Sequence, residues 1–92
     1  MYVGGEILKI VAKSIEMVAW FDINGKPHPV RFKVSEGENC VIKIDRVIKL
    51  YKERIAGNDM LIFVCQSLIA SNERLYEIKY EMCTCKWMLF KF

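Results

Sequence analysis

Hydrophobic and polar residues alternate along most of the chain, in short segments separated by turn residues. In residues 76–82 the alternation is strict, with Tyr, Ile, Tyr and Met interleaved with charged residues. Residues 29–34 alternate in the same way, whereas residues 60–65 and 85–92 are rich in bulky apolar residues. A period of two predicts strands with one buried face, and a nearly continuous apolar run predicts a strand covered on both faces.

Short turn signals stand between these segments. Asn24-Gly25 is the strongest, because both residues tolerate the positive φ that a two-residue hairpin needs. Further turn signals lie at residues 36–39, 57–59 and 71–73. This spacing predicts one all-β domain over residues 1–92, an antiparallel meander of five or six strands that closes into a small barrel or half-barrel. Oligonucleotide-binding folds and the smallest five-stranded barrels share this pattern.

Two segments can be interpreted in more than one way. Residues 40–50 fit a strand with one apolar face, or a helix that begins at Asp45 and continues to Ile55. We favour a strand, because Val and Ile dominate the segment, with a bulge near Asp45-Arg46. Residues 5–13 place Ile7, Ile10 and Val11 on one side, which predicts a short amphipathic helix.

Composition adds a constraint on how the sheet is covered. The apolar fraction of 53% is high for 92 residues, and a small domain buries only about 60–65% of its chain surface. Part of the apolar content builds the core, and any surplus would leave a patch for a partner. The dense segments predict a sheet with one half covered on both faces and the other half open. The chain has no apolar run long enough to predict a membrane span.

Cysteine usage indicates free thiols and no metal site. The N-terminus lacks the pattern of a secretory signal, so we expect a cytoplasmic protein with reduced cysteines. On a strand, Cys83 and Cys85 would face the same side. Their spacing is nevertheless not that of a zinc knuckle, and Cys40 and Cys65 lie alone in apolar segments.

Nothing in the sequence predicts catalysis or a cofactor. The single histidine, His28, is held between two prolines, which indicates an extended loop. No close pair of carboxylates is present for acid–base chemistry, and there is no glycine-rich phosphate loop. The segment Asp22-Ile23-Asn24-Gly25 begins like a calcium loop but lacks the later ligands, so we interpret it as a turn. We therefore expect a protein that is not an enzyme.

Charge is concentrated in the middle of the chain. The formal net charge is +3, and residues 26–54 carry eight basic and four acidic residues, or +4. If residues 29–34 and 40–50 pair, four cationic side chains share an outward face: Arg31, Lys33, Lys43 and Lys49. Trp20 or Phe21 from the preceding strand could add a stacking ring, as in small barrels that bind single-stranded nucleic acid. The alternative is a solvated face whose lysines protect a sheet edge.

The aromatic end of the chain offers a second candidate surface. Residues 86–92 contain Trp87, Phe90 and Phe92, and alternate side chains of such a strand face opposite ways. One set fills the core, and the other must meet a cover, a partner or water. This pattern predicts a protein interface, with a homodimer as one form of it.

Several motifs together resemble a group of small, uncharacterised proteins of Gram-positive bacteria. They include Val18-Ala19-Trp20-Phe21-Asp22, Pro29-Val30-Arg31-Phe32, Val41-Ile42-Lys43-Ile44-Asp45, Phe63-Val64-Cys65-Gln66-Ser67, Tyr76-Glu77-Ile78-Lys79-Tyr80-Glu81 and Cys85-Lys86-Trp87. The resemblance covers about residues 16–92 and leaves residues 1–14 as an N-terminal extension. The resemblance implies that the genes of this group lie beside those of lesion-bypass DNA polymerases. It hence implies an accessory role in DNA repair or replication without catalytic activity.

Overall fold

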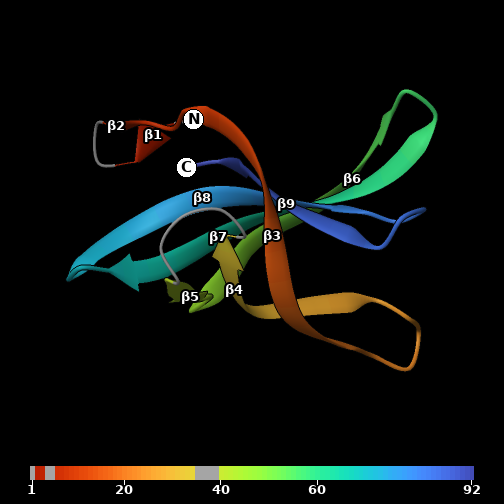
Figure 1. Cartoon of the computed structure of the whole chain (residues 1–92), viewed down its shortest axis with the longest axis horizontal. Coiled ribbons are helices and arrows are strands. Elements are labelled where there is room, and N and C mark those ends of the chain that lie inside the picture. Colours follow the sequence, from red (N-terminus) through yellow and green to blue (C-terminus); the bar gives the residue numbers. More distant parts are fainter. Residues whose placement is uncertain (1, 4–5, 35–39) are drawn as a thin grey trace.

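The computed structural model describes residues 2–3, 6–34 and 40–92, and every regular element in them is a strand. Figure 1 labels the strands. They are β1 (Tyr2–Val3), β2 (Glu6–Ile7), β3 (Ile10–Phe21), β4 (Pro27–Val34), β5 (Val41–Lys43), β6 (Arg46–Ile55), β7 (Asn58–Ile69), β8 (Asn72–Glu81) and β9 (Lys86–Lys91). The predicted all-β class is therefore confirmed.

One antiparallel sheet of seven strands forms the body of the protein. Its order is β5-β4-β3-β9-β8-β7-β6, while β1 and β2 form a separate two-stranded sheet. Strands β5 and β6 lie at opposite edges of the large sheet, yet only Ile44 and Asp45 separate them in the chain. The sheet must therefore curl until its two edges meet, and it forms a curled half-barrel (Figure 1).

Ile44 and Asp45 form the junction between the two edges. The N–H of Ile44 donates to the carbonyl of Val30 in β4 at 2.9 Å, and the N–H of Asp45 donates to the carbonyl of Gln66 in β7 at 2.9 Å. The Asp45 carboxylate also accepts a 2.7 Å bond from the N–H of Leu68. Two consecutive residues thus join opposite edges of one sheet.

This junction explains why the predicted number of strands is too low. The segment 40–50 is extended, as predicted, but it is two strands rather than one. The predicted bulge near Asp45-Arg46 is instead the point where the chain leaves β4 and begins to pair with β7.

The predicted helix over residues 5–13 is wrong. Lys9 exchanges two backbone hydrogen bonds with Phe92, and Ile10 pairs with Lys91, so β9 satisfies this backbone as a strand. A bulge with Ala12 at φ 45° shifts the register between Ile10 and Lys13. Ile10 and Val11 do not share one face as a helix would require, since Ile10 is 65% exposed and Val11 packs against the core.

The turns fall where the sequence indicates, with different geometry in two of them. Ala56-Gly57 and Ala70-Ser71 form two-residue turns with positive φ at both positions. Cys83 and Cys85 were expected to lie on a strand. They lie instead in the four-residue loop between β8 and β9. The predicted turn at residues 36–39 lies outside the described residues.

Strands β7 and β8 are covered on both faces, as predicted for the apolar half of the sheet. Residues 85–92 were predicted to be covered in the same way, but in β9 only Leu89 is buried. Residues 62–65 of β7 and 76–80 of β8 are all buried, including Glu77 and Lys79 on the outer face. Register places Ile62 of β7 between Tyr51 and Lys79, whose long side chains share its face. The Lys79 ammonium lies 3.5 Å from the centre of the Phe90 ring. Long side chains of the protein itself therefore line the outer face around Ile62.

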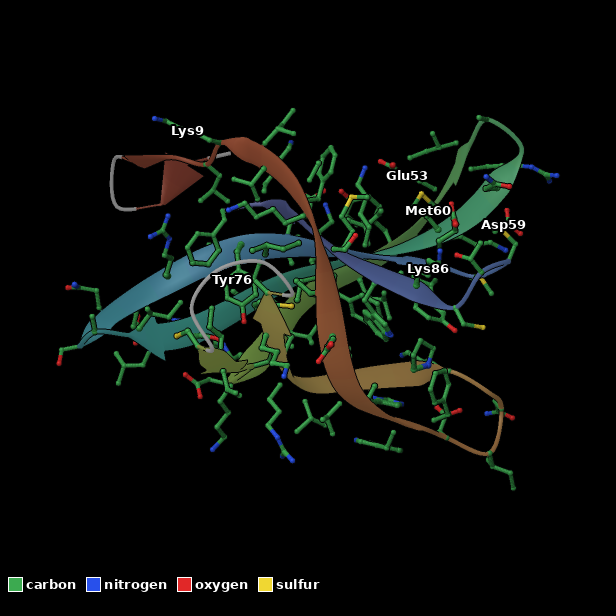
Figure 2. All side chains as sticks on the ribbon, viewed as in Figure 1. Lys9, Glu53, Asp59, Met60, Tyr76 and Lys86 are labelled. Atoms are coloured by element: carbon green, nitrogen blue, oxygen red, sulfur yellow. The ribbon has the colours of Figure 1, made fainter. Side chains whose placement is uncertain are left out.

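A polar network ties the interior to the junction. The Ser67 hydroxyl donates to the carbonyl of Lys43 at 2.5 Å, so its oxygen accepts from the Tyr76 hydroxyl, also at 2.5 Å. Tyr76 is fully buried inside the curl of the sheet (Figure 2), and burial raises the pKa of its phenol far above the usual value. The network therefore links β7 and β8 to the end of β5.

Replacing Ser67 tests whether this network stabilises the half-barrel. We expect Ser67→Ala to lower the free energy of unfolding by about 1–3 kcal/mol, because it leaves the buried Tyr76 hydroxyl without its acceptor. Urea denaturation of Ser67→Ala, Tyr76→Phe and the double variant measures the coupling. The double variant should lose less stability than the sum of the single variants, and strict additivity would contradict the network.

Candidate functional site

The outer surface of β3, β4 and β5 gathers most of the predicted cationic residues. Arg31 of β4 pairs directly with Lys43 of β5, and Lys33 pairs with Val41 one row further along. The predicted pairing of residues 29–34 with the segment after residue 40 is therefore confirmed for residues 41–43. We call the outward side chains of Arg31, Lys33 and Lys43, with Trp20 and His28 beside them, the basic face.

The charges of the basic face are unevenly compensated. The Lys33 ammonium lies 3.3 Å from the Glu16 carboxylate on β3, so its charge is partly neutralised. Arg31 and Lys43 are both exposed, and neither takes part in an ion pair with any described residue. Like charges directly opposite on neighbouring strands weaken a sheet. The Arg31–Lys43 pair is therefore a local cost to the fold that an anionic ligand would relieve.

An aromatic stack continues the basic face toward the β3–β4 turn. The rings of Trp20 and His28 lie 3.9 Å apart and only 8° from parallel, on residues that pair across β3 and β4. The Trp20 side chain remains 56% exposed. Phe21, the other candidate ring, contacts Tyr80 edge-on instead. Trp20 therefore follows Val18, the partner of Arg31, on the same face of β3.

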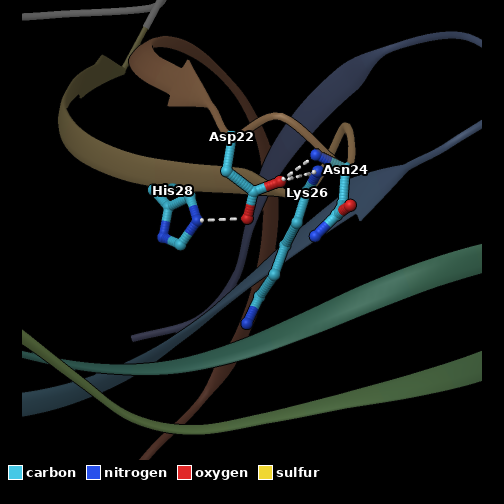
Figure 3. A network of polar contacts seen from close by, with 4 residues as sticks. All are labelled: Asp22, Asn24, Lys26 and His28. Atoms are coloured by element: carbon cyan, nitrogen blue, oxygen red, sulfur yellow. Dashed lines mark hydrogen bonds and ion pairs between the residues drawn. The ribbon is translucent and has the colours of Figure 1, made fainter.

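Asp22 fixes the position of this stack (Figure 3). One carboxylate oxygen lies 3.1 Å from Nε2 of His28, and the other accepts from the N–H groups of Asn24 and Lys26 at 2.9 and 3.0 Å. The His28 contact and then the Lys26 amide hold the Asp22 pKa below its usual 3.8. The sequence predicted the turn but not the contact between Asp22 and His28. The short spacing of these two residues around a turn is the signal that could have predicted it.

The geometry of the turn also differs from the predicted two-residue hairpin. Asp22 pairs with Lys26, with its N–H donating to the Lys26 carbonyl, and Gly25 donates to the Asp22 carbonyl. Gly25 has φ +80°, which completes a three-residue loop. His28 lies on β4 rather than in a loop, so the loop expected for it is wrong.

A gap separates the beginning of β4 from β6, and we call it the seam. The hydrogen bond from the Asp22 N–H shows that the carbonyl of Lys26 points toward β3. Backbone N–H and C=O groups alternate in direction along a strand, so those of Pro27 and Pro29 point the other way, toward the seam. Proline has no N–H to donate there. Backbone pairing therefore does not extend along β4 past the junction contact between Val30 and Ile44.

The seam contains a cavity of about 330 Å³. Its lining combines both prolines with apolar and basic side chains from each side: Lys26, Pro27, His28, Pro29, Val47, Ile48, Lys49, Leu50 and Phe63. Lys49, the fourth predicted cation, lies here on β6, with its ammonium 5.1 Å from the centre of the Tyr51 ring. The structure therefore separates Lys49 from Arg31, Lys33 and Lys43 by the seam.

The three residues predicted to form an interface do not share one surface. Trp87 packs in the interior against Phe63 and Tyr80, with ring centres 5.6 and 4.5 Å apart. Phe92 also packs against the core, whereas Phe90 lies under the Lys79 ammonium. A partner role for these residues stays a prediction.

The four cysteines are free, and their surroundings differ. Burial raises the Cys65 pKa to about 12, so this thiol stays protonated at neutral pH. Cys40, Cys83 and Cys85 are exposed and free. Across residues 2–3, 6–34 and 40–92, no three His, Cys, Asp or Glu side chains are grouped so that they could hold a metal ion. In the same residues, no helix is long and apolar enough to span a membrane.

Comparison with known proteins returns no matching family model, no matching curated protein and no matching solved structure. The resemblance to a Gram-positive group stays a prediction.

The Asp22 contacts predict a pH-dependent change at low pH. Because the folded-state pKa lies below the ordinary 3.8, the ionised carboxylate stabilises the turn above that pH. This contribution is lost as the pH falls through the lowered pKa. We expect the Trp20 indole signal in NMR to shift in that range in the wild type and to stay constant in Asp22→Asn. Asp59→Asn is the control and should behave as the wild type, while an unchanged titration in Asp22→Asn would contradict the assignment.

Proposed function

We propose that this protein is a non-enzymatic accessory module that binds single-stranded nucleic acid through its basic face. The observation that carries the proposal is the Arg31–Lys43 pair. Two cations lie opposite each other on an edge of the sheet, without a carboxylate partner among the described residues. A phosphate backbone would remove the repulsion between them and release its counterions on binding.

The aromatic stack beside these cations supports single-stranded nucleic acid as the ligand. Trp20 is exposed, and its ring is held flat against His28. Unpaired bases stack on such rings with little dependence on sequence, while neighbouring cations follow the backbone. Duplex bases are already stacked on each other and offer no free face to Trp20. The basic face therefore combines the two features that single-strand binding needs.

The four predicted cations are not equivalent in this proposal. Arg31 and Lys43 have no carboxylate partner in the described residues 2–3, 6–34 and 40–92, whereas Lys33 shares its charge with Glu16. Lys49 would contact the bound nucleic acid only where the nucleic acid crosses the seam. A DNA polymerase as partner, and a homodimer through the aromatic C-terminal strand, stay predictions of the sequence.

Neutralising the pair tests the proposal. We expect Arg31→Gln/Lys43→Gln to weaken binding of fluorescein-labelled dT20 and U20. Fluorescence anisotropy measures this between about 20 and 200 mM salt, over which the Debye length falls from about 21 to about 7 Å. The slope of log affinity against log salt should fall by about 1.4, because each phosphate contact to a single strand contributes about 0.7.

The matched control removes one lysine and one arginine elsewhere. Lys9→Gln/Arg54→Gln gives the same net charge, and both residues are exposed. Figure 2 shows Lys9 far from β4 and β5, and Arg54 lies near the β6–β7 turn. The control should bind nearly as the wild type. Equal losses in both variants would mean that only net charge matters, and no binding by the wild type at low salt would overturn the proposal.

The same variant should separate binding from stability. Removing the repulsion between Arg31 and Lys43 should leave the urea midpoint of Arg31→Gln/Lys43→Gln equal to that of the wild type or higher. Binding would then be lost without unfolding. A clearly lower midpoint would show that these two cations stabilise the sheet, which would contradict a role reserved for a ligand.

A further inference from the structure

We propose that the seam cavity is a subsite for one nucleotide of the bound strand, with the base against His28 and the prolines and the phosphate between Lys26 and Lys49. The inference rests on the proposed function, because it assigns the cavity to the same ligand. The connection is physical: His28 lines the cavity and also stacks on Trp20 of the basic face. Single-stranded nucleic acid bound across Arg31 and Lys43 can therefore continue into the seam.

The size of the cavity suits a small ligand. Its volume of about 330 Å³ is at the lower end of the range of about 300–1,000 Å³ for small-molecule sites. That space accommodates a single base with part of its sugar, but no folded partner. The cavity persists because Pro27 and Pro29 prevent β4 from pairing with β6 across it.

The His28 ring is prepared for a base to stack on it. Trp20 covers the ring on one side, and Asp22 holds its Nε2 edge. The side chain is nevertheless 33% exposed, and it contributes to the cavity wall. A base in the cavity would extend the Trp20–His28 stack by one ring, and the rigid prolines would flank it.

The charges on the two walls suit the phosphate of a nucleotide. Lys26 extends from the β3–β4 turn toward the strands across the seam (Figure 3), and Lys49 contributes from β6. Neither lysine forms an ion pair within the described part of the chain. On the β4 side, the Asp22 carboxylate is already bound to His28 and two backbone amides. The cavity wall therefore combines positive charge with an apolar surface.

A carboxylate placed in the cavity tests the subsite. Ile48 lines the cavity and is 47% exposed, so Ile48→Glu should fold normally. We expect it to weaken dT20 binding at least about fivefold, because stacking of one base contributes about 1–3 kcal/mol. The control is Ile55→Glu on the same strand, where the side chain is 41% exposed and outside the cavity. It adds the same charge and should bind nearly as the wild type.

Mononucleotides separate this inference from the proposed function. Titration of 5′-AMP and 5′-dTMP should shift the NMR signals of His28 and of the Ile48 methyl groups in the wild type and equally in Arg31→Gln/Lys43→Gln. In Ile48→Glu, which has no Ile48 methyl signal, the His28 signal should not respond. If dT20 binding depends on Arg31 and Lys43 but not on Ile48, and mononucleotides shift neither signal, the subsite is overturned while the proposed function stands. If dT20 does not bind the wild type at all, both fail.

Discussion

The fold depends on a constraint that acts at two residues. Ile44 and Asp45 must reach both edges of a seven-stranded sheet, because the strands before and after them belong to opposite edges. A flat sheet cannot satisfy that connection, so the sheet curls, and the curl creates the interior that Tyr76 and its neighbours fill. The backbone bonds to Val30 and Gln66 and the Ser67 network concentrate at this point. Closure is therefore local, and the rest of the perimeter is free to stay open.

The open part of the perimeter follows from two prolines. Pro27 and Pro29 keep β4 from donating N–H groups to β6, and the same residues form rigid apolar walls. Natural sheets use proline on edge strands to prevent unwanted pairing. Here the two prolines also keep apart the two walls of the seam cavity, which carry positive charge. The basic face lies where β4 pairs with β5, and the seam begins where that pairing ends, beyond the contact between Val30 and Ile44.

Much of this architecture was accessible from residue patterns, and the failures have physical reasons. Alternation located residues 76–82, and density of apolar residues located residues 60–65 as covered on both faces, because local periodicity reflects burial directly. The helix expected at residues 5–13 failed because this backbone pairs with β9, whose residues are distant in sequence. Lys49 was assigned to the wrong surface because the change of partner at Ile44–Asp45 depends on contacts distant in sequence. The Trp20–His28–Asp22 arrangement likewise needs the register of β3 against β4.

The position of β9 has a consequence for how the chain reaches its folded state. The last strand in the sequence lies between β3 and β8, so it is the central strand of the sheet. Without β9, the strands β5-β4-β3 and β8-β7-β6 would be two separate three-stranded units, which the chain joins through Ile44 and Asp45. Pairs such as Ile10 with Lys91 join distant parts of the chain, and such contacts slow folding. Insertion of β9 therefore joins the two half-sheets, because this strand pairs with the inner edges of both, β3 and β8.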